Sequence, residues 1–134
     1  MWPFLLLRKI GIGKGREILK SSESMKSNAN FKEVYQNGKS YANVYLIMYV
    51  LRNESGKNRI GISVSRKVGN SVVRHRITRL IRESYRLNEE MFNSGLDIVV
   101  IARVGARGKS YNEINSALMH LAGIHKILKE MIKS

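Results

Sequence analysis

The stretch SVSRKVGNSVVRHRITRLIRESYRLN, residues 63–88, contains the end of a strand, a tight turn and a long helix. The turn is Lys67-Val-Gly-Asn70, and either Asn70 or Ser71 is a good N-cap for a helix that runs to about Asn88. Residues three or four apart share a helix face, so one face collects the apolar side chains Val73, Ile77, Leu80 and Ile81. We therefore predict a helix that packs this face on a sheet.

The opposite face of this helix collects arginines: Arg76, Arg79, Arg82 and Arg86, with Arg74 at the seam. Between Arg59 and Arg86 the sequence has eight Lys or Arg residues and one acid, Glu83, which can pair with Arg79 at i,i+4. A solvent-exposed helix face normally carries charges of both signs, whereas the arginines of this ridge on the helix would repel one another. Since guanidinium groups suit forked hydrogen bonding to phosphate, the ridge favours a polyanion partner.

Strands and helices are predicted on both sides of this stretch. In chain order they are a helix from about Ser24–Asn28 to Asn37, a strand Tyr41–Leu51, a hairpin loop Asn53–Asn58, a partner strand Arg59–Ser65, the helix above, a buried strand Asp97–Ala102 and a last helix from Ser110 or Asn112. The fold class is α+β, a compact α-β sandwich in which helices pack on one mainly antiparallel sheet, in the order α-β-β-α-β-α.

Length and composition set the domain organisation and exclude several functions. The chain has 134 residues and a net charge of +14, with no Cys, three His and ten scattered acids. We expect a basic extension at residues 1–23 and one domain at 24–134. The few acids disfavour a metal-dependent active site, so we predict neither catalytic residues nor a metal site in this protein. The apolar run Trp2–Leu7 is too short to span a membrane, and a soluble cytoplasmic protein is expected.

The predicted hairpin also suggests a second surface. Tyr49 lies on the mixed aromatic and polar face of its strand, and Ser63 and Ser65 lie on the small-residue face of the next. If the apolar faces of the two strands align, small residues adjoin exposed rings. The sequence therefore predicts a shallow trough with ring faces in it.

The segment Ser65–Glu83 resembles the signature of the protein subunit of bacterial ribonuclease P. The positions that match the signature are Gly69, Asn70, Arg74, His75, Arg76, Arg79 and Arg82. The resemblance extends from about Ser24 to the C-terminus. His75 stands where Asn is commoner in that family, and Thr78 where Lys or Arg is frequent.

The resemblance implies a protein that does not cleave RNA by itself. A large catalytic RNA holds Mg²⁺, none of it bound by the protein alone, and removes the 5′ leader of precursor tRNA. The implied contacts to the catalytic RNA come from Arg66, Lys67, Asn70, Arg74, Arg76, Arg79 and Arg82. The implied leader-binding groove contains Phe31, Tyr35, Tyr49, Ser63 and Ser65. The implied fold includes a left-handed βαβ crossover, an exception to the usual hand.

Other functions remain open from the residues alone. A ribosomal or other structural RNA-binding protein would share the basic ridge and would not require the aromatic trough. A helix-turn-helix DNA binder needs a helix just before the recognition helix, whereas here a strand and a tight turn precede it, so no DNA partner is expected. A membrane surface would favour a Trp- or Phe-rich apolar face, and this helix has an aliphatic one, so no membrane partner is expected.

Overall fold

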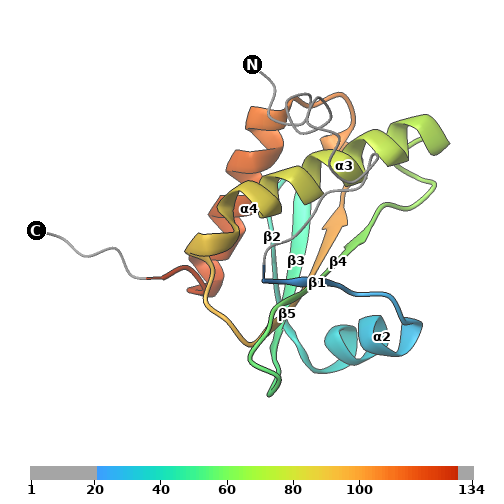
Figure 1. The fold of residues 1–134 in the computed structure, drawn as a ribbon. Helices are drawn as coiled ribbons and strands as arrows, with labels where there is room; N and C mark the ends of the chain where they lie inside the picture. Colours follow the sequence, from blue (N-terminus) through green and yellow to red (C-terminus); the bar gives the residue numbers. More distant parts are fainter. Residues whose placement is uncertain (1–20, 130–134) are drawn as a thin grey trace, which may run out of the picture.

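The computed structural model describes residues 21–129, so the prediction for residues 1–20 lies outside the described part of the chain. The elements in chain order are β1 Glu23–Ser24, α2 Asn28–Asn37, β2 Lys39–Ala42, β3 Leu46–Arg52, β4 Arg59–Ser63, α3 Ser71–Asn88, the 3₁₀ turn η2 Glu89–Met91, β5 Leu96–Ala102, the 3₁₀ turn η3 Val104–Ala106 and α4 Tyr111–His125 (Figure 1). The predicted α+β class and the order of the main elements are confirmed.

Within residues 21–129, five strands form one sheet in the order β1-β4-β5-β3-β2. The longest pairing, between β3 and β5, is antiparallel, whereas β4 runs parallel to β5 on the other side. β5 is the central strand because its sequence, LDIVVIA, is apolar on both faces and every residue except Ile101 is buried. The prediction of a strand buried on both faces is therefore confirmed.

The predicted strand Tyr41–Leu51 is wrong, because the chain turns within it and makes two strands. The side-chain oxygen of Asn43 accepts hydrogen bonds from the backbone N–H groups of Tyr45 and Leu46, at 3.2 and 3.0 Å. This local bonding stabilises a turn between β2 and β3. Val44, which falls inside the predicted strand, lies in that turn and is 67% exposed.

The predicted hairpin between β3 and β4 is also wrong, since β5 lies between them. Polar side chains hold the intervening loop at the start of β5. Arg59 donates two hydrogen bonds to Asp97, at 2.9 and 2.6 Å, and Asn53 donates one to the same carboxylate, at 2.7 Å. β4 therefore returns to its parallel neighbour β5 through α3, a βαβ crossover whose hand stays a prediction.

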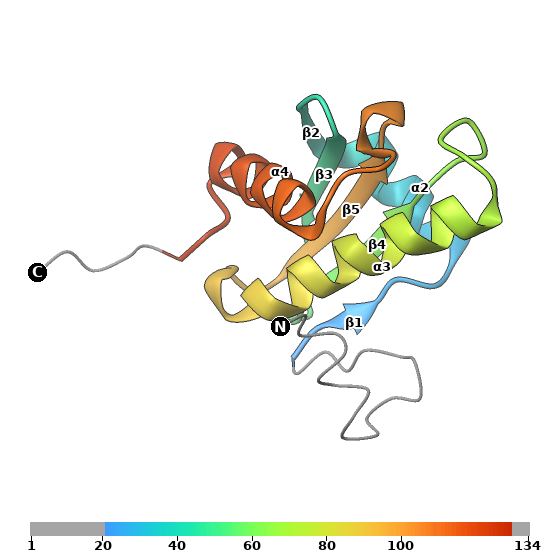
Figure 2. The same ribbon diagram turned by 90° about the horizontal axis from the view of Figure 1, so that it is seen from above.

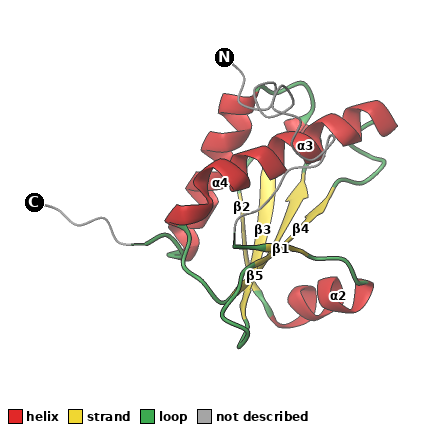
Figure 3. Cartoon of the chain, in the orientation of Figure 1, coloured by secondary structure: helices red, strands yellow, loops and turns green. Residues whose placement is uncertain are grey.

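Helices cover the two faces of the sheet unequally. α3 and α4 pack on one face, and α2 lies on the other (Figures 2 and 3). The large core lies between the sheet and α3 and α4, and includes Leu46, Met48, Ile77, Ile98 and Leu118. A smaller cluster of Met25, Val34 and Val99 lies under α2. Within residues 21–129, Tyr49, Leu51 and Ile101 on this face are only partly buried.

The first described residues, at the end of the predicted extension, already contact the fold. The Ser22 hydroxyl lies 2.7 Å from the buried hydroxyl of Tyr85, and the backbone N–H of Ser21 donates to Glu89 at 3.1 Å. β1 then adds to the sheet beside β4. None of the helices in residues 21–129 is long and apolar enough to cross a membrane.

Candidate nucleic-acid interface

The helix α3 begins where the sequence predicts. The Asn70 side chain accepts a hydrogen bond from the N–H of Val73 at 3.0 Å, which confirms Asn70 as the N-cap. On the inner face Ile77, Leu80 and Ile81 are buried, as predicted, and Val73 is half-buried. Packing this face fixes the rotation of the helix, and the rotation decides where the arginines point.

The cations of the turn and of α3 lie on the outer side of the protein. Arg66, Lys67, Arg76 and Arg79 are exposed, and Arg74 and Arg82 are half-buried. Within residues 21–129 none of Arg66, Lys67, Arg74, Arg76 and Arg82 forms an ion pair with an acid. The Nε of Arg74 is buried without a hydrogen-bond partner in this part of the chain, as expected for a side chain at the seam.

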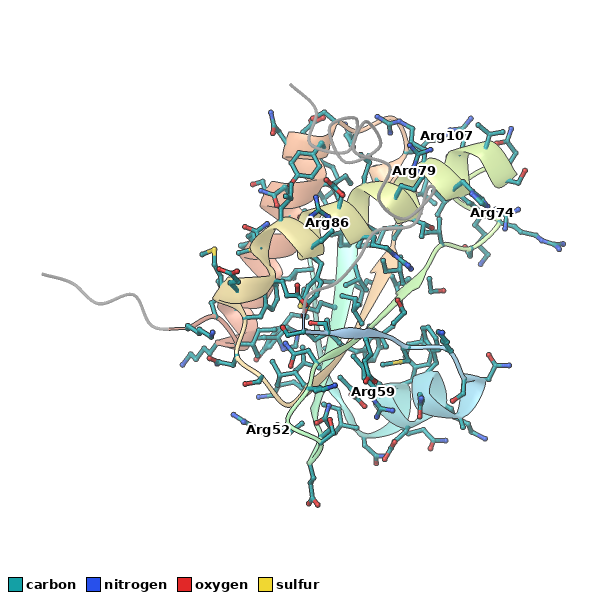
Figure 4. All side chains as sticks on the ribbon, viewed as in Figure 1. Arg52, Arg59, Arg74, Arg79, Arg86 and Arg107 are labelled. Carbon is teal, nitrogen blue, oxygen red and sulfur yellow. The ribbon has the colours of Figure 1, made fainter. Side chains whose placement is uncertain are left out.

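Two arginines of the basic stretch, Arg59 and Arg86, form ion pairs within the protein instead. Arg59, at the start of β4, is bound to buried Asp97, and Arg86 is bound to buried Glu83 at 2.8 and 3.2 Å. Figure 4 shows Arg59 near the loop beside Arg52, and Arg74, Arg79 and Arg86 along α3. The i,i+4 spacing predicts that Glu83 pairs with Arg79, whereas the structure shows its two-pronged pair with Arg86.

A second basic segment, residues 103–109, joins the arginines of α3. The Arg76 guanidinium donates to the backbone oxygen of Lys109 at 3.0 Å, and Arg107 is exposed nearby in the same loop. The Lys109 ammonium lies 5.3 Å from the centre of the Tyr45 ring, and Arg103 donates to the backbone oxygen of Asn43 at 2.7 Å. We call the turn 66–70, the outer side of α3 and the loop 103–109 the basic surface.

The sequence-based prediction did not place the loop 103–109 in the site. Its position follows from the parallel pairing of β4 and β5, because the carboxyl ends of parallel neighbours lie at one edge of a sheet. The turn that leads into α3 and the loop after β5 therefore meet. A prediction that β4 pairs in parallel with β5 would have placed this loop beside the turn into α3. The wrongly predicted hairpin between β3 and β4 excluded that pairing.

The predicted groove residues Phe31, Tyr35, Tyr49 and Ser63 come together on the α2 side of the sheet. The ring centres of Phe31 and Tyr35 are 6.3 Å apart, and those of Tyr35 and Tyr49 are 5.1 Å apart at an interplanar angle of 72°. Burial raises the pKa of the Tyr35 hydroxyl, and the Ser63 side chain acts in the opposite direction. We call these four residues the aromatic cluster. Ser65 is exposed beyond the end of β4.

The floor of the aromatic cluster differs from the predicted trough. Val99 of β5 lies between Tyr49 and Gly61 in the register, so the rings do not adjoin the small residues directly. Gly61 makes room for a ring, since a Cβ there would lie 2.6 Å from Cζ of Phe31. Phe31 therefore packs partly as core, while Tyr35 is 38% exposed.

The histidines and acids of residues 21–129 form no cluster of three or more side chains that could hold a metal ion. His120 lies beside the amide of Asn43, and the His125 ring lies 2.9 Å from the backbone oxygen of Met48. Burial lowers the pKa of His125. These two histidines serve the packing of α4 against the sheet.

Comparison with known proteins gives a consistent result. The family model described as Ribonuclease P matches residues 19–126. The ribonuclease P protein component of Lachnoclostridium phytofermentans is 68% identical over 107 residues, which cover 80% of this chain and 92% of that protein. The protein component from Alkaliphilus metalliredigens is 49% identical over 110 residues, covering 82% of this chain and 99% of its own length.

Solved structures agree with these relatives. The RNase P protein of Staphylococcus aureus superposes with a TM-score of 0.75 at 37% identity, covering 81% of this chain and 99% of that one. The RNase P protein of Thermotoga maritima gives a TM-score of 0.68 at 29% identity, covering 74% of this chain and 94% of that one. The similarity therefore spans both the basic surface and the aromatic cluster.

Proposed function

The chain belongs to the ribonuclease P protein family, and from this premise we propose that its two surfaces bind two different RNAs. Members of the family are protein components of ribonuclease P, an endoribonuclease that has an RNA partner, and this chain is such a component. In our proposal the basic surface binds the catalytic RNA, and the aromatic cluster binds the 5′ leader of precursor tRNA. The complex then removes the leader by endonucleolytic cleavage in the cytoplasm.

The basic surface is suited to a folded RNA. The observation that carries the proposal is that five cations of α3 and its turn form no ion pair with an acid within residues 21–129, whereas Arg59 and Arg86 do; the five are Arg66, Lys67, Arg74, Arg76 and Arg82. Phosphate contacts of this kind position a protein on RNA and require no particular base sequence. The capped N-terminus of α3 adds free N–H groups that favour a phosphate at Asn70.

The aromatic cluster is suited to a single strand. Successive unpaired bases stack on aromatic side chains with little sequence preference, and each stacked base contributes about 1–3 kcal/mol. Tyr35 and Tyr49 offer partly accessible rings, and the hydroxyls of Ser63 and Ser65 lie at the end of β4 for backbone contacts. This surface favours the leader-binding component over a purely structural RNA-binding protein.

The chemistry of cleavage belongs, in this proposal, to the RNA partner and its Mg²⁺. Two of the acids are buried and form ion pairs with arginines: Asp97 pairs with Arg59, and Glu83 pairs with Arg86. The carboxylates that could ligate a cation are thus occupied by the fold or scattered over it. The protein's own contribution is to bind and orient RNA.

The test is a reconstitution with purified protein, a ribonuclease P RNA transcript and a labelled precursor tRNA. At low Mg²⁺ we expect efficient release of the leader only when protein and RNA are both present, and no cleavage by protein alone. Cleavage by the protein in the absence of the RNA would overturn the division of labour. Equal cleavage by the RNA with and without protein would overturn the proposed role of both surfaces.

A further inference from the structure

A groove of about 860 Å³ lies between the first half of α3 and the start of α4, beside the basic surface. Val72, His75, Arg76 and Arg79 of α3 line one side, and Ser110 and Tyr111 line the other. The basic ridge alone does not predict this hollow, since phosphates need only a convex row of cations. Its volume lies in the range typical of pockets that hold small molecules, about 300–1,000 Å³.

The floor of the groove is apolar and its rim is cationic. Leu80 is buried at the base, Tyr111 is half-buried beside it, and Val72 is 75% exposed at the outer end. Arg76 and Arg79 rise along the α3 side, and the Arg76 guanidinium is held at the backbone oxygen of Lys109. An exposed Val and a half-buried Tyr beside two arginines favour a ligand that is flat and apolar in one part and anionic in another.

The one acid in the groove does not oppose an anion. Both oxygens of Glu83 accept hydrogen bonds from Arg86, at 3.2 and 2.8 Å, and Glu83 is 1% exposed. Its charge is compensated by the Arg86 guanidinium. The Glu83 carboxylate therefore does not repel an anion at the mouth of the groove.

We propose that this groove receives one unpaired nucleobase of the RNA partner, on the Tyr111 and Leu80 floor, while Arg76 and Arg79 bind the flanking phosphates. The inference rests on the proposed function, because it specifies how the basic surface contacts the catalytic RNA. Unstacked bases of loops and bulges are the parts of RNA that proteins bind through aromatic side chains. His75 lies on the rim, where its ring can contact the same base.

The test compares Tyr111→Leu with Tyr111→Phe in binding to a ribonuclease P RNA transcript over a series of salt concentrations. Loss of one stacked base predicts that Tyr111→Leu weakens binding by roughly 5-fold to 150-fold, whereas Tyr111→Phe binds like the wild type. Because no phosphate contact is lost, the slope of log K against log salt stays unchanged. Arg76→Ala lowers the magnitude of that slope by about 0.7–0.9.

A second measurement identifies the base. Dimethyl sulfate and carbodiimide modification of the RNA should show an unpaired base that wild-type protein protects and that Tyr111→Leu leaves reactive. Tyr41→Leu, which removes a ring that packs on His125 outside the groove, is the matched control and should preserve the protection. His75→Ala, at an exposed side chain, keeps the test informative if Tyr111→Leu fails to fold, and should also weaken binding at constant slope.

Three outcomes would overturn the inference. Wild-type affinity of folded Tyr111→Leu and His75→Ala would show that no base enters the groove, and a reduced salt slope for Tyr111→Leu would show a purely ionic contact. A change in the mass of the free protein on Tyr111→Leu, measured by light scattering, would assign the groove to a second copy of the chain. In each case the proposed function stands if Arg76→Ala still weakens RNA binding, and fails if it does not.

Discussion

The basic surface and the aromatic cluster are built by different means. The basic surface is mostly one helix, α3, whose inner face fixes its rotation and whose outer face presents arginines. The aromatic cluster takes Phe31 and Tyr35 from α2, Tyr49 from β3 and Ser63 from β4, with Val99 of β5 beneath. A helix surface tolerates small displacements because charge acts over several ångströms, whereas stacking requires contact. The two surfaces should therefore respond differently to substitution and to salt.

The largest expected effect is on the basic surface. Each charge-assisted hydrogen bond contributes about 1.5–3 kcal/mol, so Arg76→Ala combined with Arg79→Ala should weaken binding of the RNA transcript by about 100-fold after screening by salt. Filter binding across a salt series measures the effect. For the wild type we expect a slope magnitude of about 4–5, given roughly six phosphate contacts.

The matched control for the double variant is Arg52→Ala, which removes an exposed arginine at the end of the sheet opposite the loop 103–109. We expect this variant to bind the RNA like the wild type. Equal losses in the two proteins would mean that net charge, rather than the placement of cations on α3, determines binding, and the contrast between the two surfaces would disappear.

The aromatic cluster should show the next largest effect, and on a different RNA. Tyr49→Leu keeps an apolar side chain over Val99 and removes the ring, so the complex should bind precursor tRNA about tenfold more weakly. Its affinity for mature tRNA, which lacks the leader, should not change. Loss of both affinities would place Tyr49 in the scaffold rather than at the leader.

A third substitution tests the segment that sequence reasoning left out of the site. Arg107 is exposed in the loop beside Lys109, at the same edge of the sheet as the turn into α3. An exposed ion pair contributes up to about 1 kcal/mol, so Arg107→Ala should weaken RNA binding by up to about fivefold and lower the salt slope magnitude by about 0.7–0.9. An unchanged slope would restrict the basic surface to α3 and its turn.

The two surfaces also differ in how far the sequence predicts them. The helix α3 follows from local information, since its cap at Asn70 and the spacing of Ile77, Leu80 and Ile81 determine both its bounds and its outer face. The strand order depends on non-local pairing. Nothing in the neighbourhood of Asn53–Asn58 shows that β5, some forty residues later in the sequence, inserts between β3 and β4.

Local chemistry misled the prediction at one further point. The run from Tyr41 to Leu51 is rich in residues that favour strands, and Asn43 within it makes a turn through two side-chain hydrogen bonds to the backbone. The sequence alone identifies the aromatic residues of the cluster. That Val99 and Gly61 lie beneath their rings follows only from the observed strand register. A site on one helix is therefore predictable from sequence to a greater extent than a site assembled from a helix and three strands.

The smallest expected effect is a loss of stability in acid that neither surface causes. Burial lowers the pKa of His125 below its ordinary value, with the nearby charge of Lys39 acting in the same direction and the Met48 carbonyl opposing it. The folded state thus binds fewer protons than the unfolded state, so the stability contributed by neutral His125 is fully present above the unfolded-state pKa of about 6.5. It is lost as the pH falls below that value and through the lowered pKa of the folded protein. Thermal melts between pH 8 and pH 5 should show a decline in the melting temperature that is smaller in His125→Gln than in the wild type. If His125→Gln declines as steeply as the wild type, the acid sensitivity lies elsewhere, and binding measurements at low pH would have to be corrected for a different group.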